Sequence, residues 1–421
     1  MRDLRRGARV AGSGLRRWWW GCRAVHSRAL TLAGCPLSAA EECRHFKLIG
    51  TTGAGKSTAI RELLAAALAR GDRAVIADPD GSYCAHFLDR WRGDAVLGPF
   101  EGGARWDPFS ELREVYDAEH VAGALVATSA DAGAAEWREY ARTLLAALLG
   151  RCAARGGGLS DLWRLLAVAP PQELRTLLAG TAAEPFVEPE NARMFGSIRA
   201  IAVAAARGLE FVRQQRTHGF CIRDWVCGGR GVLFIPYRAR QIAALRGLIA
   251  AWMGLAIFEA LSGQEEHDQR LWFIVDELDA LGAIHGLKDA LARLRKFGGR
   301  CVLGFQSIAQ VSGTYGPAEA QTIVENCGNT LILRASASEG GGTARFASQL
   351  IGERERLRRQ VVRGRDCGGG LFAAARRSTQ VSEQALVEAA VMPSELEQLP
   401  DLTGYLRTAC SPVWYRVRLR R

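Results

Sequence analysis

The amino-acid sequence predicts an α/β fold, in which a mainly parallel β-sheet is covered by helices on both faces and is interrupted by an inserted all-α domain. Three observations lead to this prediction. Short apolar runs typical of buried strands alternate with helical stretches over residues 29–103 and 218–421. Residues 104–217 instead show helical periodicity with Gly- and Pro-containing breaks. The 421 residues are 48% hydrophobic, which is enough for a large core in two or three domains.

Residues 1–28 form a basic segment that we expect to be disordered. Residues 1–50 hold ten Arg or Lys against three acidic residues, within a chain of formal net charge +11. Such segments suit nucleic-acid phosphates or anionic lipid, although solubilising surface charge explains them equally well. Three consecutive tryptophans at residues 18–20 are more typical of an interfacial segment than of a spanning helix.

Cysteine usage and hydropathy limit the classes of protein to which this chain can belong. The eleven cysteines are scattered and contain no C-x-x-C pair. Structural zinc and a disulfide framework are therefore not expected, and a reducing compartment is favoured. No apolar run approaches the roughly 18 residues that a membrane-spanning helix needs.

The first strand of the predicted sheet leads into a phosphate-binding loop. The strand, residues 46–49, precedes GTTGAGKS at residues 50–57 and a helical segment at residues 57–70. The glycines of G-x-x-x-x-G-K-[ST] allow a tight path, and its backbone N–H groups point inward at a phosphate. A chance glycine-rich turn is the alternative, and the flanking strand and helix argue against it. The predicted nucleotide-binding residues are Gly50, Thr51, Thr52, Gly53, Ala54, Gly55, Lys56, Ser57 and Thr58.

Two side chains of this loop are assigned chemical roles. Lys56 is expected to reach the β- and γ-phosphates, and the Ser57 hydroxyl is expected to ligate Mg²⁺. The expected cofactors are therefore ATP, or another nucleoside triphosphate, and Mg²⁺.

The remaining elements follow in order along the chain. A strand at residues 73–77 ends at Asp78 and Asp80, which we interpret as turn chemistry rather than metal ligands. A long apolar helix is expected near residues 239–261. Further strands are predicted at residues 231–236, 270–275, 300–305 and 331–334, and the helices of the insertion at residues 117–128, 135–149, 159–168, 172–178 and 192–215. The stretch 354–377 is basic and looks irregular, so no role is assigned to it.

The strand at residues 271–275 ends in an acidic pair, which is the second signature of a phosphate-loop NTPase. Asp276 is expected to hold the Mg²⁺ shell, and Glu277 to orient or deprotonate the attacking water. Gln306 ends the next strand, 30 residues later, where an amide can contact the γ-phosphate or the water. An ordinary strand-end Gln is the alternative. A basic helix lies between these strands and could supply an arginine finger to a neighbouring subunit.

These motifs together resemble the conjugative type IV coupling proteins of the TraD/TrwB kind. The resemblance covers roughly residues 29–415 and keeps its order and spacing. It rests on residues 50–57, residues 70–81, Glu136 and Trp137, residues 276–278, Gln306 and Ser307, residues 315–322, residues 391–393 and residues 399–402.

The resemblance implies a RecA-like motor domain interrupted by an all-α domain, with ATP hydrolysis stimulated by DNA. By position, Arg295 is similar to the proposed arginine finger that acts in trans. The implied partners are DNA without strong sequence preference, a relaxase or relaxosome, the type IV secretion channel and further copies of the chain in a homo-hexamer. The implied location is the bacterial cytoplasm, at the cytoplasmic face of the inner membrane.

Two alternatives remain open from the sequence. Another hexameric DNA or secretion-assembly translocase would share both NTPase motifs. The chain also departs from the family pattern, because it begins with a basic stump where family members carry transmembrane helices. A nucleotide-binding adaptor without useful turnover is therefore the second alternative.

Overall fold

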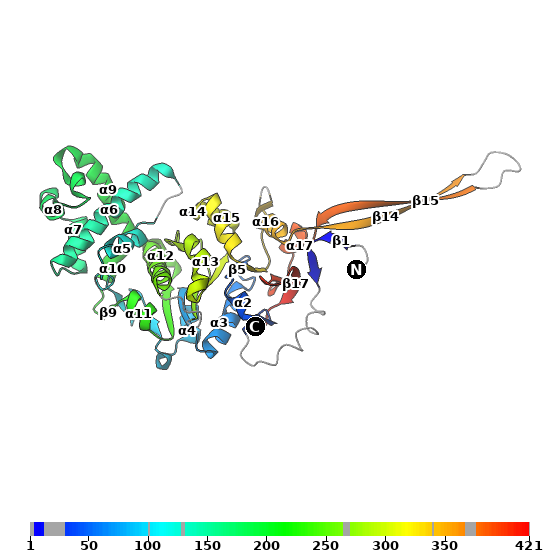
Figure 1. Ribbon diagram of the computed structural model, residues 1–421, viewed down its shortest axis with the longest axis horizontal. Coiled ribbons are helices and arrows are strands. Elements are labelled where there is room, and N and C mark those ends of the chain that lie inside the picture. Colours follow the sequence, from blue (N-terminus) through cyan, green and yellow to red (C-terminus); the bar gives the residue numbers. More distant parts are fainter. Residues whose placement is uncertain are drawn as a thin grey trace.

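The computed structural model describes residues 4–11, 30–99, 102–127, 131–263, 270–338, 341–366 and 376–420. Its centre is a ten-stranded sheet in the order β2-β17-β16-β13-β5-β12-β11-β6-β10-β7 (Figure 1). From β13 to β7 every neighbouring pair is parallel. These strands are β5 (Phe46–Ile49), β6 (Arg73–Pro79), β7 (Ala95–Val96), β10 (Val232–Tyr237), β11 (Leu271–Val275), β12 (Gly299–Phe305) and β13 (Asn329–Ile332). The predicted mainly parallel sheet is therefore confirmed.

The strands of this sheet are apolar on both faces because helices cover both. In β6, Val75 and Ala77 belong to one hydrophobic core while Ala74 and Ile76 belong to the other. The first core holds α12 (Ala239–Ser262), α13 (Leu287–Arg293), α14 (Ile308–Tyr315) and α15 (Pro317–Asn326). The second holds α3 (Lys56–Ala69), with α4 (Ser82–Phe87) and the short pair β3 (Thr31–Leu32) and β4 (Cys35–Pro36). The short α2 (Ala39–Glu42) precedes β5.

Antiparallel strands extend one edge of the sheet. β16 (Thr403–Arg407) pairs with β13, and β17 (Val413–Arg418) pairs with β16. Before them lie α16 (Gly342–Ile351) and α17 (Pro393–Glu397), which pack against each other. At the outer edge, β2 (Arg9–Ala11) pairs in parallel with β17.

Residues 117–212 form a group of helices at one end of the molecule (Figure 1), and their apolar side chains share one hydrophobic core with α12 and the sheet. The helices are α5 (Asp117–Leu125), α6 (Ala132–Ala154), α7 (Leu159–Ala167), α8 (Pro171–Leu178), α9 (Ala192–Ala205) and α10 (Gly208–Val212), with short 3-10 turns at Glu184–Val187 and Pro189–Asn191. The helix expected over residues 192–215 is divided into α9 and α10. At the division Gly208 approaches α12 closely, since a Cβ there would lie 2.7 Å from the Leu248 Cβ.

The two connections between these helices and the sheet run side by side. β8 (Arg105–Trp106) pairs in parallel with β9 (Gly219–Phe220), and α11 (Ile222–Gly228) then leads back into β10. The stretch 104–217 is thus not wholly helical, because β8 lies inside it.

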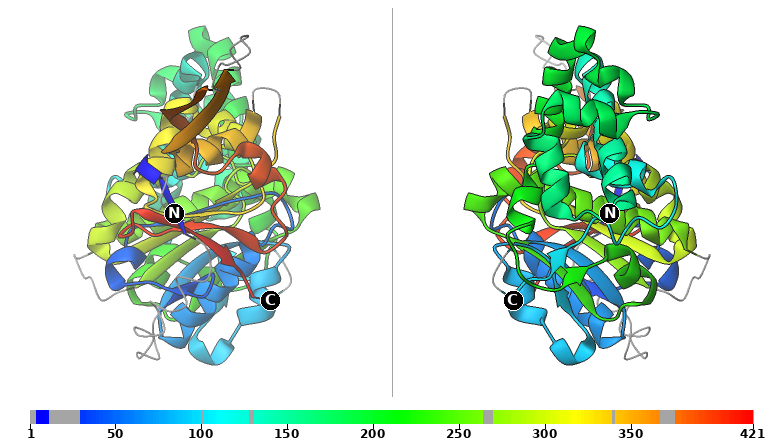
Figure 2. Two further views of the ribbon diagram at one scale, coloured as in Figure 1. Left: turned by 90° about the vertical axis from the view of Figure 1, so that its right-hand side faces the viewer. Right: turned by 90° about the vertical axis from the view of Figure 1, so that its left-hand side faces the viewer.

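A long antiparallel ribbon projects from the opposite end of the molecule (Figures 1 and 2). It consists of β14 (Glu353–Asp366) and β15 (Arg376–Ala389), and β1 (Leu4–Gly7) pairs with the base of β14. The interpretation of residues 354–377 as irregular is therefore wrong for residues 354–366 and 376–377, while residues 367–375 lie outside the described residues. The expectation of disorder is also wrong for residues 4–11, because β1 and β2 gain hydrogen-bonded partners far along the chain. The tryptophans at residues 18–20 lie outside the described residues.

Among the described residues, α12 is the one helix long and apolar enough to cross a membrane. However, 61% of its most apolar stretch is buried inside the fold, where it packs against α5, α11 and α13. Its apolar character is accounted for by this position in the core.

Candidate functional site

The predicted site residues lie at one edge of the sheet. The phosphate loop follows β5, the acidic pair follows β11 and Gln306 follows β12. Because β5, β12 and β11 are adjacent and parallel, their carboxyl ends meet at the same edge, which is where ligands bind in open α/β sheets.

The backbone of the phosphate loop has the path that its glycines predict. Gly53 and Gly55 have φ values of 76° and 119°, in the left-handed region that favours glycine. Helix α3 begins directly after Gly55, which has no side chain to cap the first N–H groups. Those N–H groups and the helix dipole together favour an anion at this point.

Two distant segments hold this loop in place. The Thr51 N–H donates to the Arg334 carbonyl after β13 at 2.8 Å, and the Leu402 N–H donates to the Ala54 carbonyl at 2.9 Å. A Cβ on Gly55 would lie 2.9 Å from the Leu402 Cδ2. The C-terminal segment therefore packs directly on the loop, a contact that no local sequence pattern indicated.

Lys56 is buried and its ammonium group is held by the loop itself. Its Nζ donates to the carbonyls of Gly50 at 2.7 Å and Thr51 at 3.3 Å. Burial lowers the pKa of this group, although the nearby carboxylates of Asp276 and Glu277 oppose the shift. A phosphate placed in the loop would add the negative charge that favours the charged form of Lys56.

Ser57 and Asp276 are brought together as the sequence predicts. The Ser57 Oγ donates to the Asp276 Oδ2 at 2.6 Å, and the Tyr83 hydroxyl donates to the same oxygen at 2.8 Å. The Asp276 Oδ1 is buried and has no hydrogen-bond partner among the described residues. A buried carboxylate with one unsatisfied oxygen beside a hydroxyl fits the oxygen ligands that Mg²⁺ prefers.

A hydrogen-bonded chain joins the phosphate loop to Glu277. The Thr52 Oγ1 donates to the Gln306 Oε1 at 2.9 Å, and the Gln306 Nε2 donates to the Glu277 Oε1 at 3.2 Å. Burial and the neighbouring Asp276 raise the pKa of Glu277. The raised pKa makes Glu277 a stronger base than an exposed glutamate, as a residue that deprotonates water requires.

Arg295 is not brought to this edge within the chain. It is exposed, in the 3-10 turn Leu294–Phe297 that precedes β12, whereas Gln306 follows the same strand. The seven residues of β12 separate the two positions by about 20 Å. An Arg295 side chain could therefore contact a nucleotide only on another copy of the chain.

Tyr83 is a site residue that sequence reasoning missed. It lies in α4 after the turn at Asp78, whose carboxylate accepts from the N–H groups of Tyr83 at 2.9 Å and Cys84 at 2.7 Å. Burial raises the pKa of Asp78 to about 6. The interpretation of Asp78 as turn chemistry is confirmed, and this turn is what directs Tyr83 to Asp276.

Comparisons with known proteins agree with this geometry. Residues 29–420 match the family model for the type IV secretion-system coupling protein DNA-binding domain. The chain belongs to this family. It is 31% identical to the coupling protein TraD of Escherichia coli K12 over 391 residues, which are 90% of this chain and 52% of TraD. The chain therefore spans about half the length of that relative.

Solved structures show the same fold over the whole coupling-protein chain. The unbound conjugative coupling protein TrwBdeltaN70 matches with a TM-score of 0.86 at 31% identity, covering 99% of this chain and 94% of that one. Plasmid coupling protein TrwB in complex with ADP and Mg²⁺ matches with a TM-score of 0.85, also at 31% identity and the same coverage. The predicted RecA-like phosphate-loop fold is thereby confirmed.

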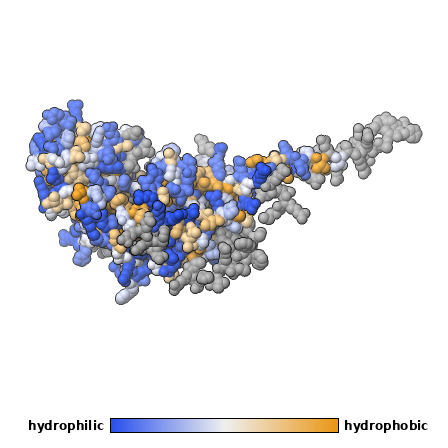
Figure 3. Space-filling model, in the orientation of Figure 1, coloured by the Kyte–Doolittle hydropathy of each residue, from blue (hydrophilic) through white to orange (hydrophobic). Residues whose placement is uncertain are grey.

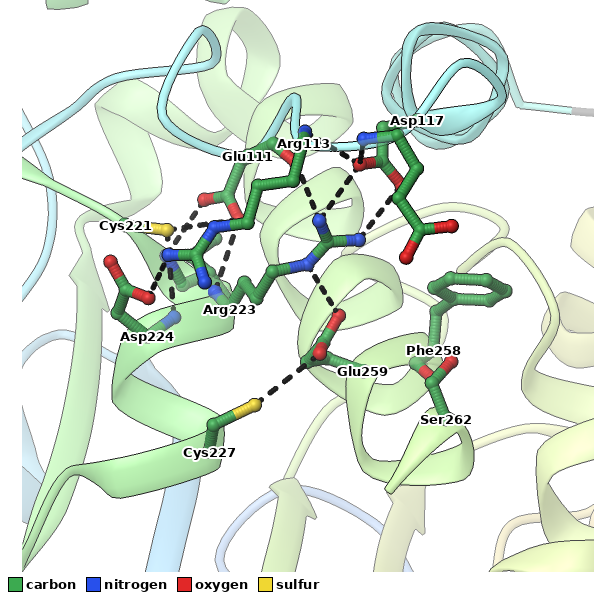
Figure 4. Close-up of polar contacts among 12 residues, drawn as sticks. Glu111, Arg113, Asp117, Cys221, Arg223, Asp224, Cys227, Phe258, Glu259 and Ser262 are labelled. Atoms are coloured by element: carbon green, nitrogen blue, oxygen red, sulfur yellow. Dashed lines mark hydrogen bonds and ion pairs between the residues drawn. The ribbon is translucent and has the colours of Figure 1, made fainter. Parts of the chain in front are cut away.

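The coupling-protein chain holds a second buried polar cluster, between the helical region and the sheet (Figure 4). At its centre Arg223 donates to both oxygens of Asp117 at 2.8 Å and to Glu259 at 2.9 Å. Its backbone N–H and that of Ile222 donate to Glu111, at 3.0 and 2.7 Å. Asp117 opens α5, Arg223 lies in α11 and Glu259 lies in α12. The cluster thus joins the start of α5 to α11 and α12.

The ion pair between Arg223 and Asp117 stabilises the charged form of both side chains, and the pKa values of both shift accordingly. Burial opposes ionisation of Asp117, but hydrogen bonds from Arg223 and from two backbone N–H groups outweigh it and lower the pKa. The bond to Asp117 also raises the pKa of Arg223. The adjacent cavity leaves only about 10 Å³ for the centre of a water molecule, which is room for about one water. This cluster is therefore structural.

Proposed function

We propose that this chain is the ATP-hydrolysing, DNA-binding motor part of a type IV coupling protein, which passes relaxase-bound DNA to a secretion channel at the inner membrane. The observation that carries the proposal is the linked arrangement of Ser57, Asp276, Glu277, Gln306 and Thr52 at the edge of the sheet. It occurs in a chain of the coupling-protein DNA-binding family, whose member TrwB has been solved with ADP and Mg²⁺.

The chain's own groups suit Mg·ATP. The N–H groups of the loop and the Lys56 ammonium would hold the β- and γ-phosphates, which requires Lys56 to exchange its bonds to loop carbonyls for phosphate oxygens. The Ser57 hydroxyl and the Asp276 carboxylate would hold the metal, directly or through water. When bound, Mg²⁺ neutralises charge that develops on the transferred phosphoryl group.

Glu277 is proposed as the general base and Gln306 as the residue that reports on the γ-phosphate. Glu277 would orient the attacking water and accept its proton. Gln306 bonds to Glu277 and to Thr52 of the phosphate loop, so a change in the loop on nucleotide binding is passed directly to the base. This placement of Gln306 favours a catalytic role over that of an ordinary residue at the end of a strand.

Assembly into a homo-hexameric ring is part of the proposal. Arg295 lies about 20 Å along β12 from the site of its own chain, so it would complete the site of a neighbour. We further propose that residues 104–217 form a distinct helical domain, inserted into a motor domain made of residues 29–103 and 218–421. The Arg223 cluster would join the two domains.

Binding to DNA is proposed to be largely independent of sequence. The chain carries a formal net charge of +11, which favours contacts with phosphates. The logarithm of the affinity should therefore fall linearly with the logarithm of salt concentration, while changes of sequence have little effect. A filter-binding titration in which affinity does not respond to salt would remove phosphate contacts as the main source of binding energy.

Steady-state ATP hydrolysis by the purified chain, with and without single-stranded DNA and across protein concentration, tests the proposal. We expect turnover that rises with DNA and with self-association, since Arg295 is shared between copies. A folded, nucleotide-binding chain without hydrolysis under every condition would contradict the motor and favour an adaptor.

A further inference from the structure

Tyr83 is a buried tyrosine whose hydroxyl reaches the nucleotide edge of the sheet. Figure 3 shows hydrophobic residues exposed at several places on the surface, whereas Tyr83 is fully buried. A buried hydroxyl without a hydrogen-bond partner costs free energy, so the phenol of Tyr83 requires one. Its partner is the Asp276 Oδ2, to which it donates at 2.8 Å.

The Tyr83 ring is held from two sides. The turn after β6 has two consecutive residues in the left-handed region, Asp80 and Gly81 with φ values of 57° and 68°, and α4 begins directly after it. The Asp78 carboxylate accepts the Tyr83 N–H and so fixes the start of this helix. On the other side, the guanidinium of Arg61 on α3 lies over the ring, with its Cζ 5.6 Å from the ring centre. The direction of the hydroxyl is therefore set by the turn and by α3.

The two oxygens of the Asp276 carboxylate have different surroundings. Oδ2 accepts from the hydroxyls of Tyr83 at 2.8 Å and Ser57 at 2.6 Å, whereas Oδ1 is buried without a hydrogen-bond partner among the described residues. Gly304 of β12 leaves room beside Oδ1, since a Cβ there would lie 3.2 Å from Oδ1 and 2.2 Å from the Asp276 carbonyl oxygen. Two bonds on one oxygen thus orient the carboxylate and leave the other oxygen free to accept a ligand.

The hydroxyls of Ser57 and Tyr83 therefore have different tasks. A hydroxyl has one proton and two lone pairs. Ser57 donates its proton to Asp276, so its lone pairs remain available to a cation. Because Mg²⁺ requires near-ideal octahedral geometry at short distances, a small displacement of either side chain would weaken its binding. Tyr83 would keep Asp276 in place while Ser57 adjusts to the metal.

We propose that Tyr83 is a positioning residue, which holds the Asp276 carboxylate in the orientation that Mg²⁺ binding requires. It acts through Asp276 and does not itself contact the metal or the nucleotide. Loss of a group that orients a metal-binding carboxylate typically weakens metal affinity by about 10- to 100-fold. The inference rests on the Mg·ATP site proposed above and assigns to it a residue outside both nucleotide-binding motifs.

Tyr83→Phe in the full chain tests this role, because it removes the hydroxyl and keeps the ring. Calorimetry measures binding of a non-hydrolysable ATP analogue across Mg²⁺ concentration and in EDTA, so no turnover is required. The variant should need about tenfold more Mg²⁺ than the wild type for half-maximal enhancement of binding. Its affinity for the analogue in EDTA should be unchanged, since the phosphate loop and Lys56 are intact.

Replacement of Mg²⁺ by Ca²⁺ separates positioning from packing. Ca²⁺ accepts irregular arrangements of oxygen ligands that Mg²⁺ does not. Tyr83→Phe should therefore lose less affinity for Ca²⁺ than for Mg²⁺. A residue that only fills the core would not change the preference between the two metals.

Tyr140→Phe is the matched control. The Tyr140 hydroxyl also donates to a carboxylate, that of Glu136, but on α6 in the helical region. This variant should bind the analogue with the wild-type dependence on Mg²⁺. Urea unfolding in EDTA verifies that each protein is folded.

Two results would overturn the proposal and leave the nucleotide site standing. One is a folded Tyr83→Phe variant with the wild-type dependence on Mg²⁺. The other is an equal loss of analogue binding in EDTA and in Mg²⁺, which would mean that Tyr83 supports the phosphate loop instead of the metal ligand. A wild-type chain whose analogue binding does not respond to Mg²⁺ would contradict the metal site itself, and with it both the proposed function and this role of Tyr83.

Discussion

The two buried polar clusters of this molecule differ in whether their charges are compensated. At the nucleotide edge Asp276 and Glu277 are neighbours, one Asp276 oxygen has no partner among the described residues, and Lys56 donates to loop carbonyls. In the second cluster Arg223 bonds to Asp117 and Glu259, and the carboxylates of Asp117 and Glu111 also accept backbone N–H groups. The first cluster is thus arranged to be completed by a ligand, whereas the second is complete in itself.

The largest effect is expected from Glu277 at the incomplete cluster. Glu277→Gln keeps the size and the bond to Gln306 but removes the base, so ATP turnover should fall about 1000-fold, equivalent to about 4 kcal/mol of transition-state stabilisation. The unfolding free energy should stay the same or rise, since a buried charge next to Asp276 is removed. Steady-state kinetics and urea unfolding of the same preparation measure both quantities.

Glu325→Gln is the matched control for this change. Glu325 is an exposed glutamate on α15 whose carboxylate accepts a hydrogen bond from the Gln321 Nε2 at 2.8 Å. It should keep wild-type turnover. Retained hydrolysis in purified Glu277→Gln would contradict the assignment of the base.

At the Arg223 cluster we expect the opposite, namely that a substitution lowers the free energy of unfolding. Arg223→Met would leave the buried Asp117 and the partly buried Glu259 without their cation, and it should lower the unfolding free energy by about 3 kcal/mol. Arg113→Met breaks an exposed ion pair with Asp224, which solvent screens, and it should change the unfolding free energy far less. Urea unfolding compares the two. Equal losses would mean that the Arg223 cluster is not compensated in the way that its bonds indicate.

The contrast between the clusters also explains what the sequence could predict. The phosphate loop, the strand before Asp276 and the position of Gln306 are local patterns, and adjacent parallel strands bring them together without further information. Tyr83 and Leu402 escaped prediction because their contacts depend on a turn and on a segment about 350 residues away.

The Arg223 cluster and the ribbon escaped prediction for different reasons. Arg223 meets Asp117 across 106 residues, and nothing local distinguishes it from a surface arginine. In β14 arginines alternate with Glu355 and Leu357 over residues 354–358, which is typical of a strand, but the eight Arg residues of the ribbon suggested irregular basic sequence. Arg295 was assigned by resemblance alone, and its role stays a proposal.

His45 is a third buried polar group, and one of its two ring nitrogens lacks a hydrogen-bond partner among the described residues. The His45 Nδ1 accepts the Cys301 N–H at 3.0 Å, while its Nε2 has no partner among the described residues. Burial lowers the pKa of His45 to about 4. The unfolded chain therefore binds a proton between about pH 6.5 and pH 4 that the folded chain does not, and stability falls as pH falls through this window.

His45→Asn should flatten this dependence. The wild type should lose about 2 kcal/mol of unfolding free energy through this group between pH 7 and pH 5. Asn tolerates the φ of 48° at this position, so the backbone should persist. Urea unfolding at both pH values should show the gap between the two proteins narrowing at pH 5. A constant gap would mean that His45 does not titrate as its burial predicts.

The smallest effect is expected for changes to Gln306 and Thr52, whose hydrogen bonds connect the phosphate loop to Glu277. The bond that the Gln306 Nε2 donates to Glu277 favours the ionised carboxylate and partly offsets the rise in its pKa. Gln306→Ala removes this bond, so the acid limb of the kcat–pH profile should move to higher pH by less than about one unit. Thr52→Val removes the hydrogen bond from Thr52 to the Gln306 amide, which can then turn away from Glu277. The acid limb should therefore move in the same direction as in Gln306→Ala, but by a smaller amount. A limb that stays in place in Gln306→Ala, or a larger shift in Thr52→Val, would mean that the loop does not communicate with the base through this amide.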